Sequence, residues 1–343
     1  MFSQNFKISN LHLSSKSKTI VISEIGINHE GNFLKCLKMI DQANKVGADL
    51  IKLQVVEPSA NYEKTTKSYK IFKNSVLSDE KIFKIYDYCK NKKINIFSTF
   101  DREKFELFRK IKQPCYKISS SLFYDYYLIR DILNMNRPVL ISTGVADLKD
   151  IDTMIGLLKN HKNKKICFLH CRSLYPTENS KLNLSRIEYI SKKYKMISGY
   201  SDHTTGYEVP ITAVNMGAKI IEKHFTLDSK RKGFDHAISL EPNQFSLMVK
   251  KIRKYEQMIG DTNFKIFDKS KDALKIKSII RGYKLIKDVK KNSILKKNDF
   301  STIRMSNINN VIKFSKIIKS ILYKRIKKNL QKGKILSLKD FKI

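Results

Sequence analysis

Two histidines occupy positions from which they could bind one metal ion. His203 follows SGYSD and His224 follows IIEK, and each segment is a short run typical of a β-strand. Neutral imidazole is a good ligand for Mn, Fe, Co and Zn. Two protein ligands also leave coordination positions open for substrate oxygens, as Lewis-acid catalysis requires. The spacing alone is equally compatible with two histidines that are hydrogen-bonded in a polar cleft.

Two lysines end predicted strands in the same way. Lys52 lies in LIKLQ and Lys117 in CYKIS, and a lysine in an apolar run is costly to bury without a partner. Hydroxyl side chains follow at the ends of the same or nearby strands: Ser119, Ser120, Ser142, Thr143 and Ser201. Ammonium groups with hydroxyl and loop N–H donors suit a phosphate or carboxylate. We therefore predict an anion pocket, against the alternative that two of 57 lysines lie at strand ends by chance.

Carboxylates form a third group. Glu24 ends the first predicted strand, and Asp235 lies in KGFDHAISLEP after the last one. Either could bind sugar hydroxyls or transfer protons, or could form a salt bridge with a lysine at the same rim. Glu222 lies two residues before His224 and therefore on the same face of its strand, so an ion pair with Lys52 or Lys117 is as plausible as catalysis.

A repeating unit of strand and helix must position these side chains. Apolar, β-branched runs occur at residues 20–27, 50–54, 94–100, 115–120, 139–144, 166–171, 197–203 and 220–226. Near-continuous apolar runs are typical of strands buried on both faces. Segments between them, such as 33–46, 79–92 and 151–162, carry apolar residues at helical spacing.

Eight such alternations predict an α/β fold, a closed (β/α)8 TIM barrel. A doubly wound open sheet is the alternative, but the chain lacks a glycine-rich G-x-G-x-x-G turn or a P-loop. Nearly every run ends on a residue capable of chemistry, and barrel enzymes place their sites at the C-terminal ends of their strands. These residues include Gln54, Thr99, Ser173 and Tyr175 in addition to those above.

The strand and helix alternation stops after Gly260, which sets the predicted domain boundaries. We predict an N-terminal extension at 1–19, the barrel at 20–260 and a Lys-rich linker at 261–277. Short alternating runs at 278–343 predict a small β-rich domain that docks on another surface, because its size is marginal for independent folding.

The net charge of +36 raises the question of nucleic-acid binding. Of the 68 basic residues only 11 are arginine, whose planar fork suits phosphate better than lysine does. We therefore interpret the charge as lysine spread over exposed faces and expect no nucleic-acid partner. No apolar run of 18 residues occurs, so we expect no membrane span. Five cysteines without a framework spacing predict a reducing, cytoplasmic location.

The same residues carry a resemblance to the N-acetylneuraminate (sialic acid) synthase family, which includes the legionaminic and pseudaminic acid synthases. The similar segments, in order over residues 20–260, are SEIGINHEGN (23–32), GADLIKLQ (47–54), FSTFD (97–101), YKISS (116–120), LISTG (140–144), LHCRSLYPT (169–177), GYSDHTTG (199–206), IIEKHFTLD (220–228) and DHAISLEP (235–242). The tail GYKLIKDVKKNSILKKNDFSTIRMSN resembles, more weakly, the C-terminal antifreeze-like (SAF) domain of that family.

The resemblance implies a reaction and a set of residue roles. It implies condensation of phosphoenolpyruvate with N-acetylmannosamine or a related diacetamido sugar and water, giving a nonulosonic acid and phosphate. It implies a divalent metal, typically Mn2+ with Mg2+ or Co2+ as alternatives, held by His203 and His224. The implied phosphoenolpyruvate site is Lys52, Thr99, Lys117, Ser120, Ser142, Ser173 and Ser201, and the implied sugar contacts are Gln54, Tyr175 and Asp235. Glu24 corresponds to an acidic residue near the reacting centre.

The resemblance also implies a domain-swapped homodimer, in which Arg304 would reach the sugar's acyl group from the partner chain. Three departures bear on these expectations. Leu122 stands where an acidic residue usually orders a metal-bound water, and Arg172 stands where a small hydroxyl residue is common. Met305 and Ser306 replace the usual Pro-Gly after Arg304. A catalytically retired barrel that binds sugars or acts as a scaffold is therefore the alternative from another functional class.

Overall fold

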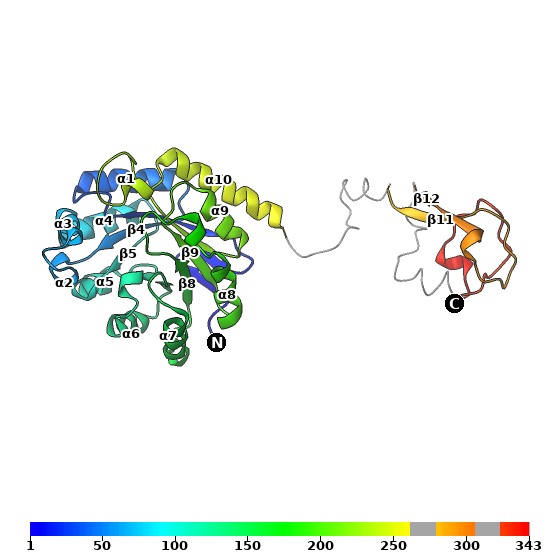
Figure 1. The fold of residues 1–343 in the computed structure, drawn as a ribbon, viewed down its shortest axis with the longest axis horizontal. Helices are drawn as coiled ribbons and strands as arrows, with labels where there is room; N and C mark the ends of the chain where they lie inside the picture. Colours follow the sequence, from blue (N-terminus) through cyan, green and yellow to red (C-terminus); the bar gives the residue numbers. More distant parts are fainter. Residues whose placement is uncertain (261–278, 306–322, 343) are drawn as a thin grey trace. The chain divides into compact units, whose positions relative to one another are not determined.

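The computed structural model describes residues 1–260, 279–305 and 323–342 (Figure 1). The chain divides into two units, Met1–Gly260 and Asp261–Ile343, and each is described by itself. The predicted linker at 261–277 lies outside the described residues.

The first unit is a closed barrel of eight parallel strands, as predicted, and not an open sheet. The strands follow one another around the barrel, and the last pairs with the first, with Glu24 opposite His224 and Lys52 opposite Glu24. The strands are β3 (Ile20–Gly26), β4 (Leu50–Val55), β5 (Ile96–Phe100), β6 (Tyr116–Ile118), β7 (Val139–Ser142), β8 (Ile166–Cys171), β9 (Ser198–Asp202) and β10 (Ile220–His224). Their residues are almost all buried, because side chains on one face fill the barrel and those on the other contact the helices.

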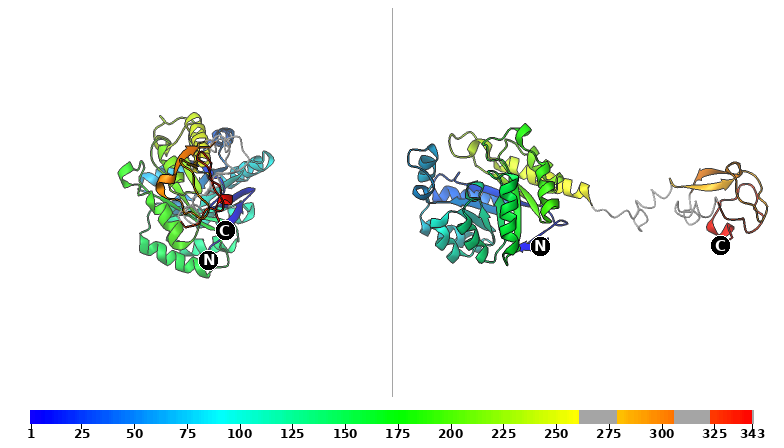
Figure 2. Two further views of the ribbon diagram at one scale, coloured as in Figure 1. Left: turned by 90° about the vertical axis from the view of Figure 1, so that its right-hand side faces the viewer. Right: turned by 60° about the horizontal axis from the view of Figure 1, so that its bottom comes forward.

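Helices surround the strands (Figures 1 and 2). They are α1 (Phe33–Lys45), α2 (Pro58–Asn61), α3 (Lys67–Asn74), α4 (Asp79–Asn91), α5 (Phe105–Ile111), α6 (Tyr126–Asn134), α7 (Leu148–Asn160), α8 (Ser185–Tyr194), α9 (Glu208–Asn215) and α10 (Pro242–Ile259). Helix α7 begins three residues before the predicted segment, because Asp147 and Asp150 form a capping box at its start. None of the described helices combines the length and apolar character needed to cross a bilayer.

The predicted N-terminal extension contains a hairpin that the sequence pattern did not reveal. Strand β1 (Asn5–Ile8) pairs antiparallel with β2 (Leu11–Ser14). Its apolar side chains Phe6, Ile8 and Leu13 are buried in one cluster with residues from the beginnings of the barrel strands, including Ile20 and Ile220. The hairpin therefore closes the barrel at the end where the strands begin.

The described part of the second unit is β-rich. Strand β11 (Arg281–Leu285) pairs antiparallel with β12 (Phe300–Arg304). Isolated bridges join 284 to 335, 289 to 330, 294 to 325 and 326 to 341. Leu285, Val289, Leu295, Ile326, Leu330, Leu336 and Phe341 form its apolar cluster.

Candidate active site

Thirteen of the site residues predicted in the barrel line one cavity of about 350 Å³, whereas Thr143 does not line it and donates its hydroxyl to the Leu169 carbonyl. Since the strands are parallel, side chains at their C-terminal ends meet at one mouth of the barrel. The thirteen are Glu24, Lys52, Gln54, Thr99, Lys117, Ser120, Ser142, Ser173, Tyr175, Ser201, His203, His224 and Asp235.

Buried charges form the floor of this cavity. Lys52 Nζ lies 2.5 Å from Glu24 Oε2 and 2.8 Å from Glu222 Oε1. Lys117 Nζ is 3.5 Å from the same Glu222 oxygen, to which Ser201 Oγ donates at 2.7 Å. Glu222 thus pairs with both rim lysines, as one of its two sequence interpretations predicted. The positive charges of the two lysines and the negative charges of the two carboxylates neutralise each other when no anion is bound.

The pKa values of these groups reflect burial and proximity together. Burial lowers the pKa of Lys52 to about 7, although attraction to Glu222 opposes the shift. Burial alone would raise the pKa of Glu222, but the ammonium groups of Lys117 and Lys52 hold it well below its usual range. Burial raises the pKa of Asp235 to about 6, against the attraction of Lys52. Perturbed groups gathered in one cavity are typical of functional sites.

The two predicted metal ligands lie beside each other, with ring centroids 5.4 Å apart. The Nδ1 of His203 lies 2.6 Å from the carbonyl oxygen of Arg172, which fixes this nitrogen as the donor. Its Nε2 therefore carries the lone pair and faces the hydroxyl of Tyr175 at 3.1 Å. Burial lowers the pKa of His203 to about 4 and that of His224 well below its usual value. Both rings are therefore neutral at physiological pH, as metal ligands must be.

The donor set fits a divalent cation. The Nδ1 of His224 is buried without a hydrogen-bond partner, and the Asp235 carboxylate lies 3.7 Å from it. The hydrogen bond from His203 to a carbonyl is the kind of support that metal-ligating histidines receive. Within residues 1–260, 279–305 and 323–342, no three His, Cys, Asp or Glu side chains converge on one point. His203 and His224 could therefore hold a cation whose other ligands would be water or substrate.

Hydroxyl groups complete the anion side of the cavity. Ser142 Oγ and Ser173 Oγ are buried and have no hydrogen-bond partner. Ser120 Oγ accepts from the backbone N–H of Gly144 at 3.0 Å. A Cβ on Gly144 would lie 2.7 Å from Ser120 Oγ and closer still to Cys171 and Ser173, so only glycine lets these groups approach. Unpaired buried donors beside two lysines suit a bound anion.

Two of the three departures from the family pattern can be located in the barrel, and Ser306 of the third lies outside the described residues. Leu122, in the short helix Ser120–Leu122, packs against the apolar core and does not line the cavity. Residue 172 contacts His203 through its backbone carbonyl, and this contact does not depend on the side chain at that position.

Some lining residues were not predicted, and one prediction lies elsewhere. Tyr62, Phe72 and Phe234 also line the cavity, the first two from the α2–α3 segment inserted between β4 and α4. The only sequence signal for this segment is the unusual length of the connection. Arg304 ends β12 in the second unit, opposite Arg281, so its predicted contact with the sugar stays a prediction.

The model of the NeuB family matches residues 39–264. Among similar curated proteins, the pseudaminic acid synthase of Campylobacter jejuni is 30% identical over 346 residues, which cover 96% of this chain and 99% of that protein. The N,N'-diacetyllegionaminic acid synthase of the same species is 30% identical over 330 residues, 91% of this chain and 98% of that protein. A similar solved structure is the N-acetylneuraminic acid synthetase of Leptospira borgpetersenii, with a TM-score of 0.75 and 28% identity over 80% of this chain and 96% of that chain. With its barrel, its cavity and these likenesses, the chain belongs to the NeuB family.

Proposed function

We propose that the enzyme condenses phosphoenolpyruvate with an N-acylated amino-sugar and water, giving a nonulosonic acid and phosphate. One observation carries the proposal: two neutral histidines, two buried lysines and unpaired buried serines line a single cavity at the C-terminal ends of the strands. This donor set is suited to a cation and an anionic enol ester held side by side. The family membership and the names of the similar synthases point to the same reaction.

We assign the two ends of the cavity to the two substrates. Lys52, Lys117 and the serines at 120, 142, 173 and 201, with Thr99, bind the phosphate and carboxylate of phosphoenolpyruvate. Tyr175 stacks on His203 and Asp235 lies 3.7 Å from His224, and these two residues with Gln54 bind the open-chain sugar through its hydroxyl groups. This placement directs the methylene carbon of phosphoenolpyruvate at the sugar carbonyl, and positioning of this kind accounts for much of the rate.

A divalent ion held by His203 and His224 would supply Lewis-acid polarisation of the sugar carbonyl. Lys52 and Lys117 balance the charge of phosphoenolpyruvate while its methylene carbon forms the new carbon–carbon bond. The former enol carbon becomes cationic, and a water molecule oriented by Glu24 attacks it and loses a proton. The resulting tetrahedral intermediate expels phosphate by cleavage of its carbon–oxygen bond.

Isotopic labelling tests this bond cleavage directly. Phosphoenolpyruvate carrying 18O at the bridging position should transfer the label entirely to phosphate. Mass spectrometry of both products would detect it, and label retained in the sugar acid would exclude the mechanism.

The identity of the sugar needs its own experiment. The segments GYSDHTTG and DHAISLEP are slightly more similar to neuraminate and legionaminate synthases than to pseudaminate ones. The two C. jejuni synthases, however, each have 30% sequence identity to this chain. We therefore propose a panel of N-acetylmannosamine and the two diacetamido-trideoxyhexoses, with phosphate release as the assay and mass spectrometry of the product. Absence of phosphate release with every sugar would favour the retired barrel, which Leu122 first suggested.

We further propose that Mn2+ is the metal, that the enzyme acts in the cytoplasm, and that a domain-swapped homodimer brings Arg304 of the second, antifreeze-like unit to the cavity. The free, buried cysteines of the described residues support a reducing compartment. The β-rich second unit supports the antifreeze-like assignment. Sedimentation of the full chain and of an Arg304→Ala variant, with the KM for the sugar, tests the assembly and the contact.

A further inference from the structure

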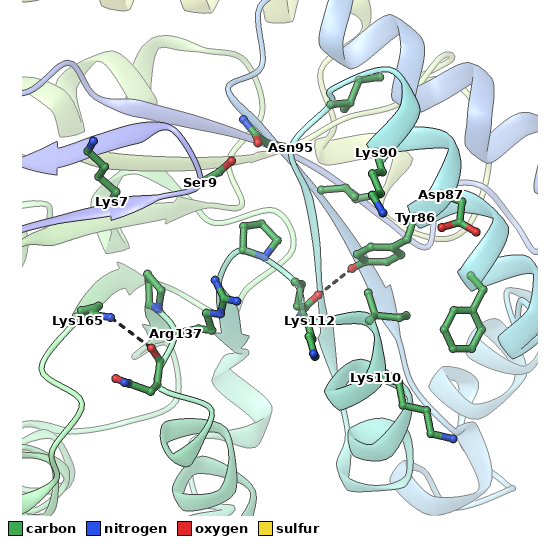
Figure 3. A pocket seen from close by; sticks show the side chains of 18 residues that line it. Lys7, Ser9, Tyr86, Asp87, Lys90, Asn95, Lys110, Lys112, Arg137 and Lys165 are labelled. Carbon is green, nitrogen blue, oxygen red and sulfur yellow. Dashed lines mark hydrogen bonds between the residues drawn. The ribbon is translucent and has the colours of Figure 1, made fainter.

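A second, larger cavity lies at the opposite end of the barrel from the candidate active site. Its volume is about 730 Å³ (Figure 3). Asn95, Pro114, Pro138 and Lys165 line it, and they lie one or two residues before strands β5 to β8. It is therefore a basal pocket, formed where the parallel strands begin and bordered by the β1–β2 hairpin, α4 and α5.

The charge of this basal pocket is strongly one-sided. Its cationic lining residues are Lys7, Lys90, Lys110, Lys112, Arg137 and Lys165, and Asp87 is the single carboxylate among the described residues that line it. None of the six cations forms an ion pair with a residue in the described part of the chain. Figure 3 shows them around the pocket, with Lys110 at its edge. Clustered cations without counter-charges repel one another, and an anion bound among them would relieve that repulsion.

Helix ends explain only part of this cluster. Lys90 and Lys110 lie in the last turns of α4 and α5, where a cation suits the partial negative charge of the carbonyl groups. Lys7 comes from the hairpin, and Arg137 and Lys165 come from the loops before β7 and β8. These three come from different parts of the sequence and lie at no helix end, so the fold itself gathers them at the pocket.

The floor of the basal pocket is a hydrogen-bonded group of uncharged residues. These residues carry no negative charge that could neutralise the cations. The Tyr86 hydroxyl donates to Gln113 Oε1 at 2.8 Å, which also accepts from the Ser98 backbone N–H at 2.8 Å. Gln113 Nε2 donates to the Ser98 carbonyl at 3.1 Å, so both ends of the buried amide are hydrogen-bonded. Beside this floor Phe83 exposes 40% of its surface. An apolar ring and unpaired cations thus border the same space.

We propose that the basal pocket binds a nucleotide, with its phosphate chain among Lys112, Arg137 and Lys165 and its base against Phe83. Arginine and lysine are the usual ligands of phosphate oxygens. An exposed aromatic ring provides a stacking surface for a base. The volume accommodates a ligand of this size, since ligand pockets typically span about 300–1,000 Å³. The proposal is independent of the reaction assigned to the other end of the barrel.

Calorimetric titration of the full chain with ATP and with inorganic tripolyphosphate tests the proposal at about 50 mM salt, where exposed charges are weakly screened. Lys112→Glu/Arg137→Glu should weaken both ligands by at least about tenfold, because two nearby attractive charges become repulsive. Phe83→Ala should weaken ATP and leave tripolyphosphate unchanged. Lys52→Met, at the other mouth, should leave both affinities unchanged.

The control must account for the high overall charge of the protein. Lys250→Glu/Lys254→Glu changes the net charge by the same amount on exposed positions of α10, away from either cavity. An equal loss of affinity in this control, or no binding by the unaltered protein, would overturn the proposal. Equal ATP affinity after Phe83→Ala would overturn the assignment of a nucleotide. If the charge-reversed variant unfolds, Lys112→Gln/Arg137→Gln replaces it, with a smaller loss expected.

Discussion

Lys223 Nζ lies 2.6 Å from Asp202 Oδ2, and both side chains are completely buried. The two residues are opposite each other in the β9–β10 pairing. Asp202 also accepts hydrogen bonds from the hydroxyls of Tyr200 and Thr204. Because His203 and His224 are the next residues along the two strands, this ion pair fixes the register that brings the two imidazoles together.

Lys223→Met should destabilise the protein by about 3–5 kcal/mol, because it leaves the Asp202 carboxylate buried without its counter-charge. Urea unfolding would measure the loss. Replacing both partners, as Lys223→Met/Asp202→Leu, should restore much of the stability while leaving the register less well fixed. Lys192→Met, which removes an exposed helical pair with Glu188, is the matched control and should show no measurable change. A Lys223→Met variant as stable as this control would contradict the prediction.

His203→Ala and His224→Ala should each abolish phosphate release and lower Mn2+ affinity sharply, because each removes one of two protein ligands. Electron paramagnetic resonance of added Mn2+ gives the affinity, and circular dichroism shows whether the fold persists. His12→Ala, on the exposed face of the hairpin, is the control and should retain both properties. Full activity of either site variant after chelation would refute the metal assignment.

Lys52→Met and Lys117→Met should each raise the KM for phosphoenolpyruvate by about tenfold or more, since each removes a charged hydrogen bond to the anion. The KM for the sugar should change much less. Steady-state kinetics with each substrate varied separately would distinguish the two effects, and Lys84→Met on the exposed face of α4 is the control. An unchanged KM for phosphoenolpyruvate would remove the basis for the anion pocket.

Gly144→Ala should abolish phosphoenolpyruvate binding, because the added methyl group would collide with Ser120, Cys171 and Ser173. Overpacking of this kind also costs about 1–3 kcal/mol of stability. The control is Gly156→Ala in α7, where the added Cβ meets nothing within 4 Å. That substitution should stabilise the protein by about 0.5–1 kcal/mol, since alanine favours a helix over glycine. Thermal unfolding of both variants measures the change in stability, and titration with phosphoenolpyruvate measures the change in binding.

Stability at acidic pH should depend on Glu30, which bridges the loops after β3 and β10. Burial opposes ionisation, but hydrogen bonds from Lys35, Arg231 and His236 lower its pKa to about 2 from 4.5. A lowered pKa in the folded state adds stability above pH 4.5, and this contribution is lost as the pH falls toward 2. Urea midpoints of the unaltered protein and Glu30→Gln should therefore differ most above pH 4.5 and converge near pH 2. A difference that is constant with pH would contradict this account.

The barrel and most of its mouth were predictable because strand ends carry a strong sequence signal. His203 and His224 follow or end a buried strand as predicted, whereas Lys52 and Lys117 lie three residues and one residue before the ends of theirs. Parallel strands leave only one edge at which such residues can meet. The carbonyl of Arg172 and the tight approach of Gly144 were not predictable in this way. Both roles depend on the backbone and on the three-dimensional proximity of segments that are distant in sequence.

The β1–β2 hairpin illustrates another limit. The two strands of the hairpin, within residues 5–14, are short and partly polar. Their apolar side chains are buried by barrel strands that come much later in the chain. No local pattern reveals such a partner.

The hairpin can complete its packing only late in synthesis of the chain. Phe6, Ile8 and Leu13 leave the ribosome before any barrel strand, yet the cluster that covers them includes Ile220 of the last barrel strand. These side chains therefore stay uncovered until some two hundred more residues have been synthesised. During translation, the nascent chain therefore carries an exposed apolar, strand-forming segment that other polypeptides can bind, and chaperones protect segments of this kind.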